Sequence, residues 1–366
     1  MVSNSSEGTA PATGSWATDG NECNHTEAWE WVYSMQPAYM GVICVLGMAA
    51  NAFVLCVFCL QRERRTVADV YLGNLALADL VMVSCLPFWV VTITQEFHWL
   101  FGEALCKLVG LTIAMNYYCS ILFVTMISVD RYLALVRPMS SVRLRDVSWA
   151  RVLCLAVWVV AGLLSLPALL FRTVKPFPEY GVEACYLDYP HEGWRIRYNM
   201  TVNILGFLIP LTVLSYCSYC IITALKNNQM RKYSAVRTGR KARHLVLIVL
   251  VVFILCWLPY QVVMFLDTLY YYHVLRGCLW ASGIDISIQL ATYLGYGNSS
   301  LNAFLYAIVG KHFRQKATRI FKLILNRKDK SETLKTIKFT SITRYNESIN
   351  LGDSELYLRN TLESSN

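Results

Sequence analysis

The sequence predicts an all-α fold, a seven-transmembrane helix bundle followed by a short amphipathic helix at the cytoplasmic membrane surface. Of the 366 residues, 55% are hydrophobic and only 16% are charged, whereas soluble domains carry about 25% charged residues. Seven mostly apolar runs reach the roughly 20 residues that a helix needs to cross a bilayer. Lysine and arginine gather between alternate runs. This composition is a poor fit for a cytosolic enzyme or a disordered protein.

The predicted spans are bounded by charged or turn-forming residues and cover 38–61, 67–94, 104–136, 148–171, 198–225, 242–270 and 282–309. The first begins after Pro37, and we expect it to act as the insertion signal, because the preceding residues have neither a basic start nor an apolar run. The expected parts are an extracellular segment (1–37), the bundle (38–310), the amphipathic helix (311–325) and a disordered cytoplasmic tail (326–366). Kinks are expected at Pro87, Pro167, Pro210 and Pro259.

Lysine and arginine positions predict the orientation. None precedes Arg62, and the segments after spans one, three, five and seven are basic. An odd number of spans then places the N-terminus outside and the C-terminus in the cytoplasm of a plasma-membrane protein. Two glycosylation sequons in the acidic leader, at Asn4 and Asn24, agree with this orientation. The net charge of +9 therefore belongs mostly to the cytoplasmic face beside membrane lipids, which argues against a nucleic-acid partner.

Four cysteines are predicted to face the oxidising side of the membrane, namely Cys23, Cys106, Cys185 and Cys278. Four cysteines can pair in three ways, and we favour Cys106–Cys185 together with Cys23–Cys278. The remaining cysteines lie within apolar helices, where the expected role is that of a small buried hydrophobic side chain.

The second span carries an acid at mid-depth, Asp79, and ionisable groups inside a bilayer are costly and often functional. Neutral polar side chains at similar depth could gather around it, the candidates being Asn51, Asn74, Asn116, Ser120, Asn298, Ser299 and Asn302. One carboxylate with several neutral oxygen ligands suits a hard monovalent cation better than a transition metal. The alternative is a hydrogen-bonded polar plug that only fixes the packing of the helices.

Two motifs indicate a bundle that can change its packing. Asp130-Arg131-Tyr132 ends the third span, where an ion pair between neighbours could break on a conformational change, although a charge cluster at a helix end is a commoner explanation. In the sixth span Pro259 removes a backbone donor, and Trp257 lies beside this weak point in a run that begins at Phe253. Several such weak points allow two packings of similar energy.

Together these features resemble the rhodopsin family of G-protein-coupled receptors, from about Tyr39 to Lys322. The motifs that carry the resemblance are Gly47 with Asn51, Leu75 to Asp79, Cys106, Asp130-Arg131-Tyr132, Trp158, Cys185, Pro210, Phe253 to Pro259, and Asn302 with Tyr306. Closer similarity is to bradykinin receptors, in segments 70–75, 86–89, 99–103, 130–136, 171–173 and 265–269. The Cys23–Cys278 pairing also fits that group, and angiotensin receptors are the nearest alternative.

The resemblance implies that the ligand is a small basic peptide of the kinin type. Asp267 and Asp285 would bind its arginine side chains, since contacts between guanidinium and carboxylate are strong and directional, although both could instead be solvated loop acids. Arg172 would bind the peptide's C-terminal carboxylate. The rest of the pocket would be lined by Trp89, Ala114, Tyr260, Gln289, Tyr293 and Tyr296. Ala114 favours the type-2 kind of kinin receptor, because the type-1 kind, which prefers peptides without the C-terminal arginine, has a lysine there.

The implied mechanism makes no covalent bond. A peptide that binds one packing better than the other would shift the population between them and open a cleft for a heterotrimeric G protein of the Gq class, with phospholipase C and calcium release as the outcome. The switch residues would be Asp130, Arg131, Tyr132, Phe253, Trp257, Pro259 and Tyr306. Sodium would favour the inactive packing when bound by Asp79, Asn116, Ser120, Asn298 and Asn302. Serines and threonines of the tail would be targets of receptor kinases that recruit arrestin, unless the tail is simply solvated.

One departure from the family is Ala303, which stands where a proline usually follows Asn302, so the part that Tyr306 plays in switching is open. A transporter is the competing class, since intramembrane acids often mark transport pathways. Asp79 is, however, the only acid deep in the predicted bundle, and there is no inverted repeat of spans. The spans contain no spacing typical of a metal site and no Ser/His/Asp set, so we expect neither an enzyme nor a cofactor other than sodium.

Overall fold

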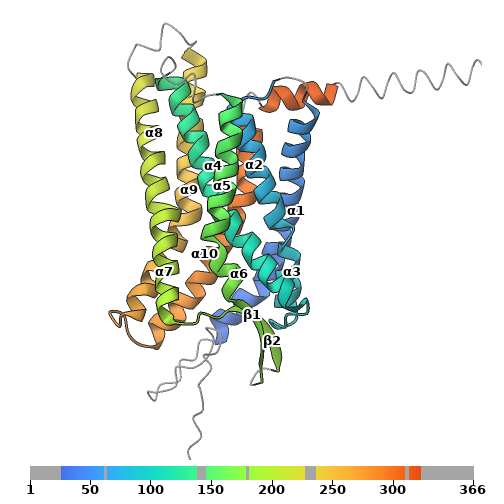
Figure 1. The fold of residues 1–366 in the computed structure, drawn as a ribbon, viewed down its shortest axis with the longest axis vertical. Helices are drawn as coiled ribbons and strands as arrows, with labels where there is room; N and C mark the ends of the chain where they lie inside the picture. Colours follow the sequence, from blue (N-terminus) through green and yellow to red (C-terminus); the bar gives the residue numbers. More distant parts are fainter. Residues whose placement is uncertain are drawn as a thin grey trace, which may run out of the picture. The chain divides into compact units, whose positions relative to one another are not determined.

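The structure, a computed structural model, describes residues 26–61, 64–137, 146–178, 181–226, 236–309 and 313–322. The chain divides into two compact units, Met1–Gly310 and Lys311–Asn366. In the second unit residues 313–322 form a helix, inside the predicted range 311–325. The first unit is a helix bundle with a β-hairpin at one end (Figure 1). The predicted sequons and the whole of the predicted tail, 326–366, lie outside the described residues.

Seven helical rods form the bundle, as the sequence predicts. They are α1 (Thr26–Leu60), α2 (Val67–Val83) with α3 (Leu86–Thr94), α4 (Gly102–Val136), α5 (Val147–Leu164) with α6 (Leu166–Phe171), α7 (Glu192–Asn203) with η1 (Ile204–Leu208) and α8 (Ile209–Lys226), α9 (Val236–Tyr271), and α10 (Cys278–Val309). Six of the rods, all but α10, contain described segments long and apolar enough to cross a membrane. The seventh, α10, carries several polar side chains that are buried in the bundle, among them Asn298 and Asn302.

Prolines mark several places where the rods are interrupted. Pro87 and Pro167 stand in the first turns of α3 and α6, where the missing N–H has no helical partner to lose, so rods two and four are each broken in two. Pro210 follows the π-helical turn η1. Pro37 lies inside α1, which already begins at Thr26; the first helix therefore begins earlier than predicted, because one proline did not end it.

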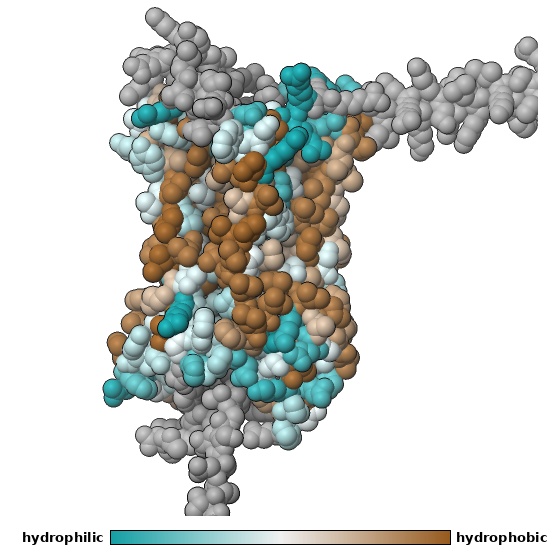
Figure 2. Space-filling view, viewed as in Figure 1, coloured by the Kyte–Doolittle hydropathy of each residue, from teal (hydrophilic) through white to brown (hydrophobic). Residues whose placement is uncertain are grey.

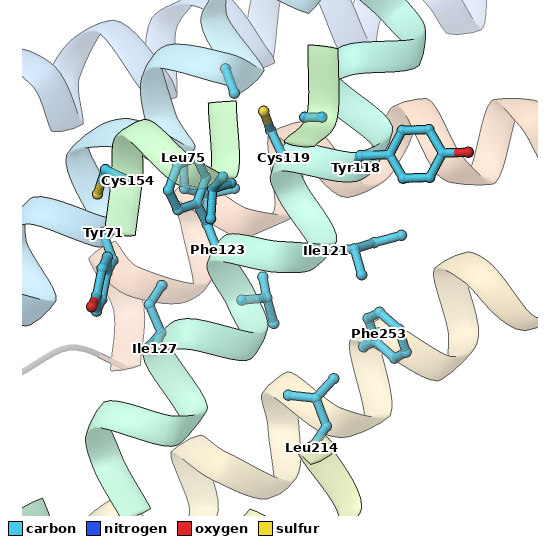
Figure 3. Close-up of a cluster of buried hydrophobic side chains, with 14 of the residues drawn as sticks. Tyr71, Leu75, Tyr118, Cys119, Ile121, Phe123, Ile127, Cys154, Leu214 and Phe253 are labelled. Atoms are coloured by element: carbon cyan, nitrogen blue, oxygen red, sulfur yellow. The ribbon is translucent and has the colours of Figure 1, made fainter. Parts of the chain in front are cut away.

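The helix α4 lies at the centre of the bundle and contacts α2, α5, α6, α8 and strand β1. Figure 3 shows part of the buried apolar cluster around it, with Cys119, Ile121, Phe123 and Ile127 from α4 and Leu75, Cys154, Leu214 and Phe253 from its neighbours. A polar bond joins two other rods, because Trp158 Nε1 donates to Asn74 Oδ1 at 3.0 Å. The helix α4 itself runs from the hairpin end of the bundle to the opposite end, where Asp130 lies.

The outer surface of the bundle is apolar over its flanks. In Figure 2 brown residues cover the middle of the visible face and teal residues collect at the two ends. Exposed apolar side chains on α5 and α6 include Leu155, Val159, Leu163 and Leu170. Soluble monomers rarely expose so continuous an apolar surface, whereas in lipid helices satisfy their own backbone and can face hydrocarbon. The surface is that of a multi-pass membrane protein.

A β-hairpin follows α6 and was not predicted. Strands β1 (Arg172–Phe177) and β2 (Val182–Leu187) are antiparallel, with Val174 opposite Cys185. The backbone N–H of Trp99, just before α4, donates to the carbonyl oxygen of Glu183 at 2.7 Å. The hairpin thus contacts the end of α4 and brings Arg172 and Cys185 there.

Candidate ligand-binding and switching sites

A disulfide holds the hairpin against the bundle. Cys106 in the first turn of α4 is bonded to Cys185 of β2, with their Cα atoms 5.7 Å apart. The first predicted pairing is therefore confirmed. Cys23 lies outside the described residues, so its pairing with Cys278 stays a prediction.

Arg172 begins β1, and its half-buried side chain lies among aromatic groups. The guanidinium carbon lies 5.5 Å from the centroid of the Trp89 ring, and Nη1 lies 3.7 Å from Cys185 Sγ. Its Nε is buried without a hydrogen-bond partner, and within the described residues no carboxylate pairs with it. Burial lowers the pKa of Arg172, yet arginine stays protonated in proteins. This half-buried cation is suited to an anionic group of a ligand.

The predicted acid pair occupies two neighbouring rods at the hairpin end. Asp267 of α9 is buried and bonded on both oxygens, because Arg195 Nη2 binds Oδ1 while Arg195 Nε and Asn199 Nδ2 donate to Oδ2 at 3.1 and 2.8 Å. Asp285 of α10 is half-buried and interacts electrostatically with both Arg195 and Asp267. Asp267 is therefore not the solvated loop acid that was the alternative, but the buried partner of Arg195.

Three of the predicted pocket residues lie on successive turns of α10. The Tyr293 hydroxyl donates to Gln289 Oε1 at 3.2 Å, and the Tyr293 ring lies 6.5 Å from that of Tyr296. Tyr39 of α1 donates to the Tyr293 carbonyl oxygen at 2.9 Å. These contacts fix an aromatic and hydrogen-bonding wall on one side of the site.

The other aromatic groups lie near Arg172. The cation interacts electrostatically with Tyr296 and with Tyr260 of α9, and the Tyr260 ring is 6.2 Å from that of Tyr117 on α4. Arg172 therefore faces tyrosines from α9 and α10. Ala114 is half-buried on α4.

The predicted polar cluster forms around Asp79, which is fully buried. Asn116 Nδ2 donates to Asp79 Oδ1 at 2.8 Å, and Asn302 Nδ2 donates to Oδ2 at 3.1 Å. Ser120 Oγ is 3.5 Å from Oδ1 and accepts from Asn298 at 3.2 Å and from Asn302 at 3.0 Å.

Three other candidates are placed differently. Ser299 extends the cluster, since its Oγ donates to Asn116 Oδ1 at 3.2 Å. Asn51 instead donates to the carbonyl oxygens of Gly47 and Ser299, and Asn74 bonds to Trp158. These two asparagines join helices rather than surround the carboxylate.

A small cavity lies between this cluster and α9. Its lining includes Ser120, Asn298, Asn302, Phe253 and Trp257. The Trp257 ring packs edge-on against Tyr117, with centroids 4.7 Å apart. Phe253 stacks on Phe207 of η1 at 5.7 Å. Pro259 lies inside α9, whose helix continues on both sides of it.

At the other end of α4 the ion pair expected from the sequence is formed. Arg131 Nη2 donates to Asp130 Oδ2 at 2.7 Å, and the acid is almost entirely buried. The Tyr132 ring lies 6.0 Å from that of Tyr216 on α8. The side chain of Tyr306 lies outside the described part of the chain.

Comparisons with known proteins agree with this architecture. Residues 50–306 match the family described as 7 transmembrane receptor (rhodopsin family). The chain belongs to this family. It is similar to the B2 bradykinin receptor of Oryctolagus cuniculus, with 45% identity over 88% of each chain. It is 46% identical to the B2 bradykinin receptor of Homo sapiens over 82% of this chain and 78% of that protein. Identity to the human B1 bradykinin receptor is 40%, over 82% of this chain and 85% of that protein.

The chain is thus a G-protein-coupled receptor of the rhodopsin family, similar to bradykinin receptors, and not an enzyme. Sequence reasoning missed several residues of its sites. Arg195 lies between two predicted spans and Asn199 at the start of the next one, and neither was predicted to be a site residue, although both bind Asp267. Tyr117 carried no motif. A polar residue on the inward face of a span was the only available signal for Asn199 and Tyr117.

Proposed function

We propose that the receptor binds a basic peptide of the kinin type and is of the B2 kind. The observation that carries this proposal is the separation of charges at the hairpin end. The guanidinium of Arg172, whose Nε is buried, has no carboxylate partner among the described residues, while Asp267 and Asp285 lie together on other rods. A peptide with arginine side chains and a free C-terminal carboxylate complements both charges, since paired charges specify orientation.

The hairpin end faces the outside in this proposal, so that a secreted peptide can reach it, and the N-terminus is extracellular. Binding shifts the population toward a packing in which Arg131 leaves Asp130. Two contacts support a path from the peptide site to the Asp79 cluster. The Trp257 ring packs on Tyr117, and the adjoining cavity is lined by both Trp257 and Ser120. The coupled partner is a Gq-class G protein, which leads to phospholipase C activation and calcium release. Receptor kinases and arrestin act on the tail, which lies outside the described residues.

A sodium ion at the Asp79 cluster is part of the proposal. The side chains fit a hard monovalent cation, because one fully buried carboxylate lies beside the Ser120 hydroxyl and the Asn116 and Asn302 amides, with no second acid at the cluster among the described residues. Both amides donate N–H to Asp79 in this structure, and they would rotate to turn their oxygens toward an ion. The holders are Asp79, Asn116, Ser120, Asn298 and Asn302. When bound, the ion supplies positive charge that offsets the buried carboxylate. We expect sodium to favour the packing with the Asp130–Arg131 pair intact, so agonist and sodium each lower the other's affinity.

The experiment is intracellular calcium in cells expressing the full chain, after bradykinin or its des-Arg form. We expect a response to bradykinin at far lower concentration, since Ala114 places no cation near the peptide's C-terminal arginine. The reverse order would assign the receptor to the B1 kind. Silence to both peptides, with surface expression verified, would contradict a kinin ligand, and a response to angiotensin would identify the nearest alternative.

A further inference from the structure

We propose that Arg195 is a specificity-determining residue of the peptide site. Its guanidinium binds the Asp267 carboxylate in the way that an arginine of the ligand would bind it, and the ligand has to displace it. The proposal rests on the proposed function, because it concerns the affinity of the same site for a basic peptide.

The geometry shows the competition directly. Arg195 uses two nitrogens, Nη2 on Oδ1 and Nε on Oδ2, the latter at 3.1 Å. This is the bidentate arrangement in which guanidinium and carboxylate match best. Asn199 Nδ2 donates to the same Oδ2 at 2.8 Å. A second guanidinium cannot make the bidentate contact with Asp267 while Arg195 stays in place.

The two partners differ in their freedom to move. The Asp267 side chain is 5% exposed, whereas that of Arg195 is 43% exposed. The carboxylate is also fixed by Asn199, which is itself buried. The acid is therefore the stationary member, and the long arginine side chain is the one that can leave toward solvent.

The local charge favours such an exchange. Arg195 interacts electrostatically with Asp285 as well as with Asp267, so two acids share one cation. The net charge of Asp267, Asp285 and Arg195 together is one negative, and a guanidinium from the ligand would bring it to zero. The site attracts a cationic peptide even while Arg195 is present, and Arg195 sets how strongly a ligand guanidinium must bind in order to be retained.

Arg197 provides a matched control on the same helix, α7. Its guanidinium carbon lies 5.4 Å from the centroid of the Trp194 ring, its side chain is exposed, and no contact in the described structure joins it to Asp267. Arg195→Gln and Arg197→Gln remove the same charge from the same segment, but only the first removes the charged partner of Asp267. Glutamine at 195 retains an amide donor for the carboxylate.

The experiment is competition binding to membranes from cells expressing the full chain, with bradykinin and with analogues in which each arginine in turn is citrulline. We expect Arg195→Gln to bind bradykinin about tenfold more tightly, in line with measured couplings of close charge pairs across interfaces, and Arg197→Gln to match wild type. At least one citrulline analogue should bind the wild-type receptor weakly, and its affinity should be no higher for the Arg195→Gln variant. In the Asp267→Asn background the gain should vanish, because the two residues act on one contact.

Unchanged or weaker bradykinin binding by Arg195→Gln at normal surface expression would overturn the proposal, as would an equal gain for every citrulline analogue. If Arg195→Gln fails to reach the surface, Arg195→Lys replaces it, because lysine keeps the positive charge but cannot make the bidentate contact. The proposal then requires Arg195→Lys to bind bradykinin more tightly than the wild type does, with no such gain for the critical citrulline analogue. Failure of the wild-type receptor to bind bradykinin would instead refute the proposed function, so the two failures are distinguishable.

Discussion

Gly110 of α4 and Arg172 of β1 approach so closely that a Cβ atom at position 110 would overlap Cδ and Nε of the arginine. The guanidinium carbon would lie 3.2 Å from the same Cβ. The absence of a side chain at 110 is therefore what lets the arginine pass along α4 and place its cation beside Trp89. The glycine acts here through close approach, not through an unusual backbone conformation.

Gly110→Ala should consequently displace the Arg172 guanidinium and weaken binding of a peptide's C-terminal carboxylate. Hydrogen bonds to charged groups contribute about 1.5–3 kcal/mol, so bradykinin affinity should fall about tenfold or more, measured by competition binding. Bradykinin with a C-terminal amide lacks the carboxylate and should lose little. Gly162→Ala is the matched control, since the nearest atom to a Cβ there is Met115 Cε at 3.9 Å. Equal losses for acid and amide peptides would contradict this role of Arg172.

Asp79→Asn should abolish the sensitivity of agonist binding to sodium. In the wild-type receptor, replacing a large organic cation by sodium at equal ionic strength should lower bradykinin affinity about fivefold, a typical size for coupled sites. The variant retains hydrogen-bonding atoms for Asn116 and Asn302 but loses the charge that a cation requires. Asn74→Ala is the control, because Asn74 bonds to Trp158 and not to Asp79. Persistent sodium sensitivity in Asp79→Asn would locate the ion elsewhere.

The bundle and the Asp79 cluster could be predicted because both follow from the cost of placing polar groups in lipid. Apolar runs identify the spans, and a buried carboxylate requires partners at its own depth, which Asn116 and Ser120 supply. The Arg195–Asp267 pair could not be predicted in this way, because the two residues are separated by 72 positions and each looked satisfied by water in a loop.

The contact of Gly110 with Arg172 depends on how β1 folds back on α4, and the hairpin itself carries no strong strand pattern. Glycines are frequent in transmembrane helices, so one more glycine indicates no particular partner. Sequence thus predicted the elements and the groups whose burial is costly, while pairings made by the shape of the hairpin end had to come from the structure.

Tyr117→Phe should raise the signalling of the receptor in the absence of agonist. The Gln261 amide on α9 donates to the Tyr117 hydroxyl on α4 at 2.9 Å, and the same ring packs on Trp257. This bond stabilises a packing in which the Asp130–Arg131 pair is intact, and a buried hydrogen bond contributes roughly 1 kcal/mol. Losing it should raise basal inositol phosphate accumulation about fivefold when the active packing is rare.

The control for this prediction is Tyr118→Phe. The Tyr118 hydroxyl is buried without a hydrogen-bond partner, so removing it takes away no bond between α4 and α9. Basal signalling that rises equally in both variants would show that the change comes from packing around the rings and not from the bond to Gln261.

Ala303→Pro should be tolerated, although proline inside a helix costs about 3 kcal/mol. Most of that cost comes from the lost N–H and from the freed carbonyl four residues earlier, which here belongs to Ser299. Asn51 Nδ2 already donates to that carbonyl oxygen at 3.1 Å, so the freed acceptor keeps a partner. Ala291→Pro is the matched control in α10, because in the described structure no side chain donates to the carbonyl of Ser287.

Surface expression and calcium response of the two variants measure the difference. We expect Ala303→Pro to reach the surface within about twofold of wild type and to respond to agonist, because only the ring's contact with the preceding turn remains to be accommodated. Ala291→Pro, which leaves the carbonyl of half-buried Ser287 unpaired in the bundle, should be retained inside the cell. Loss of both variants alike would mean that the Asn51 bond does not compensate for the missing helical one.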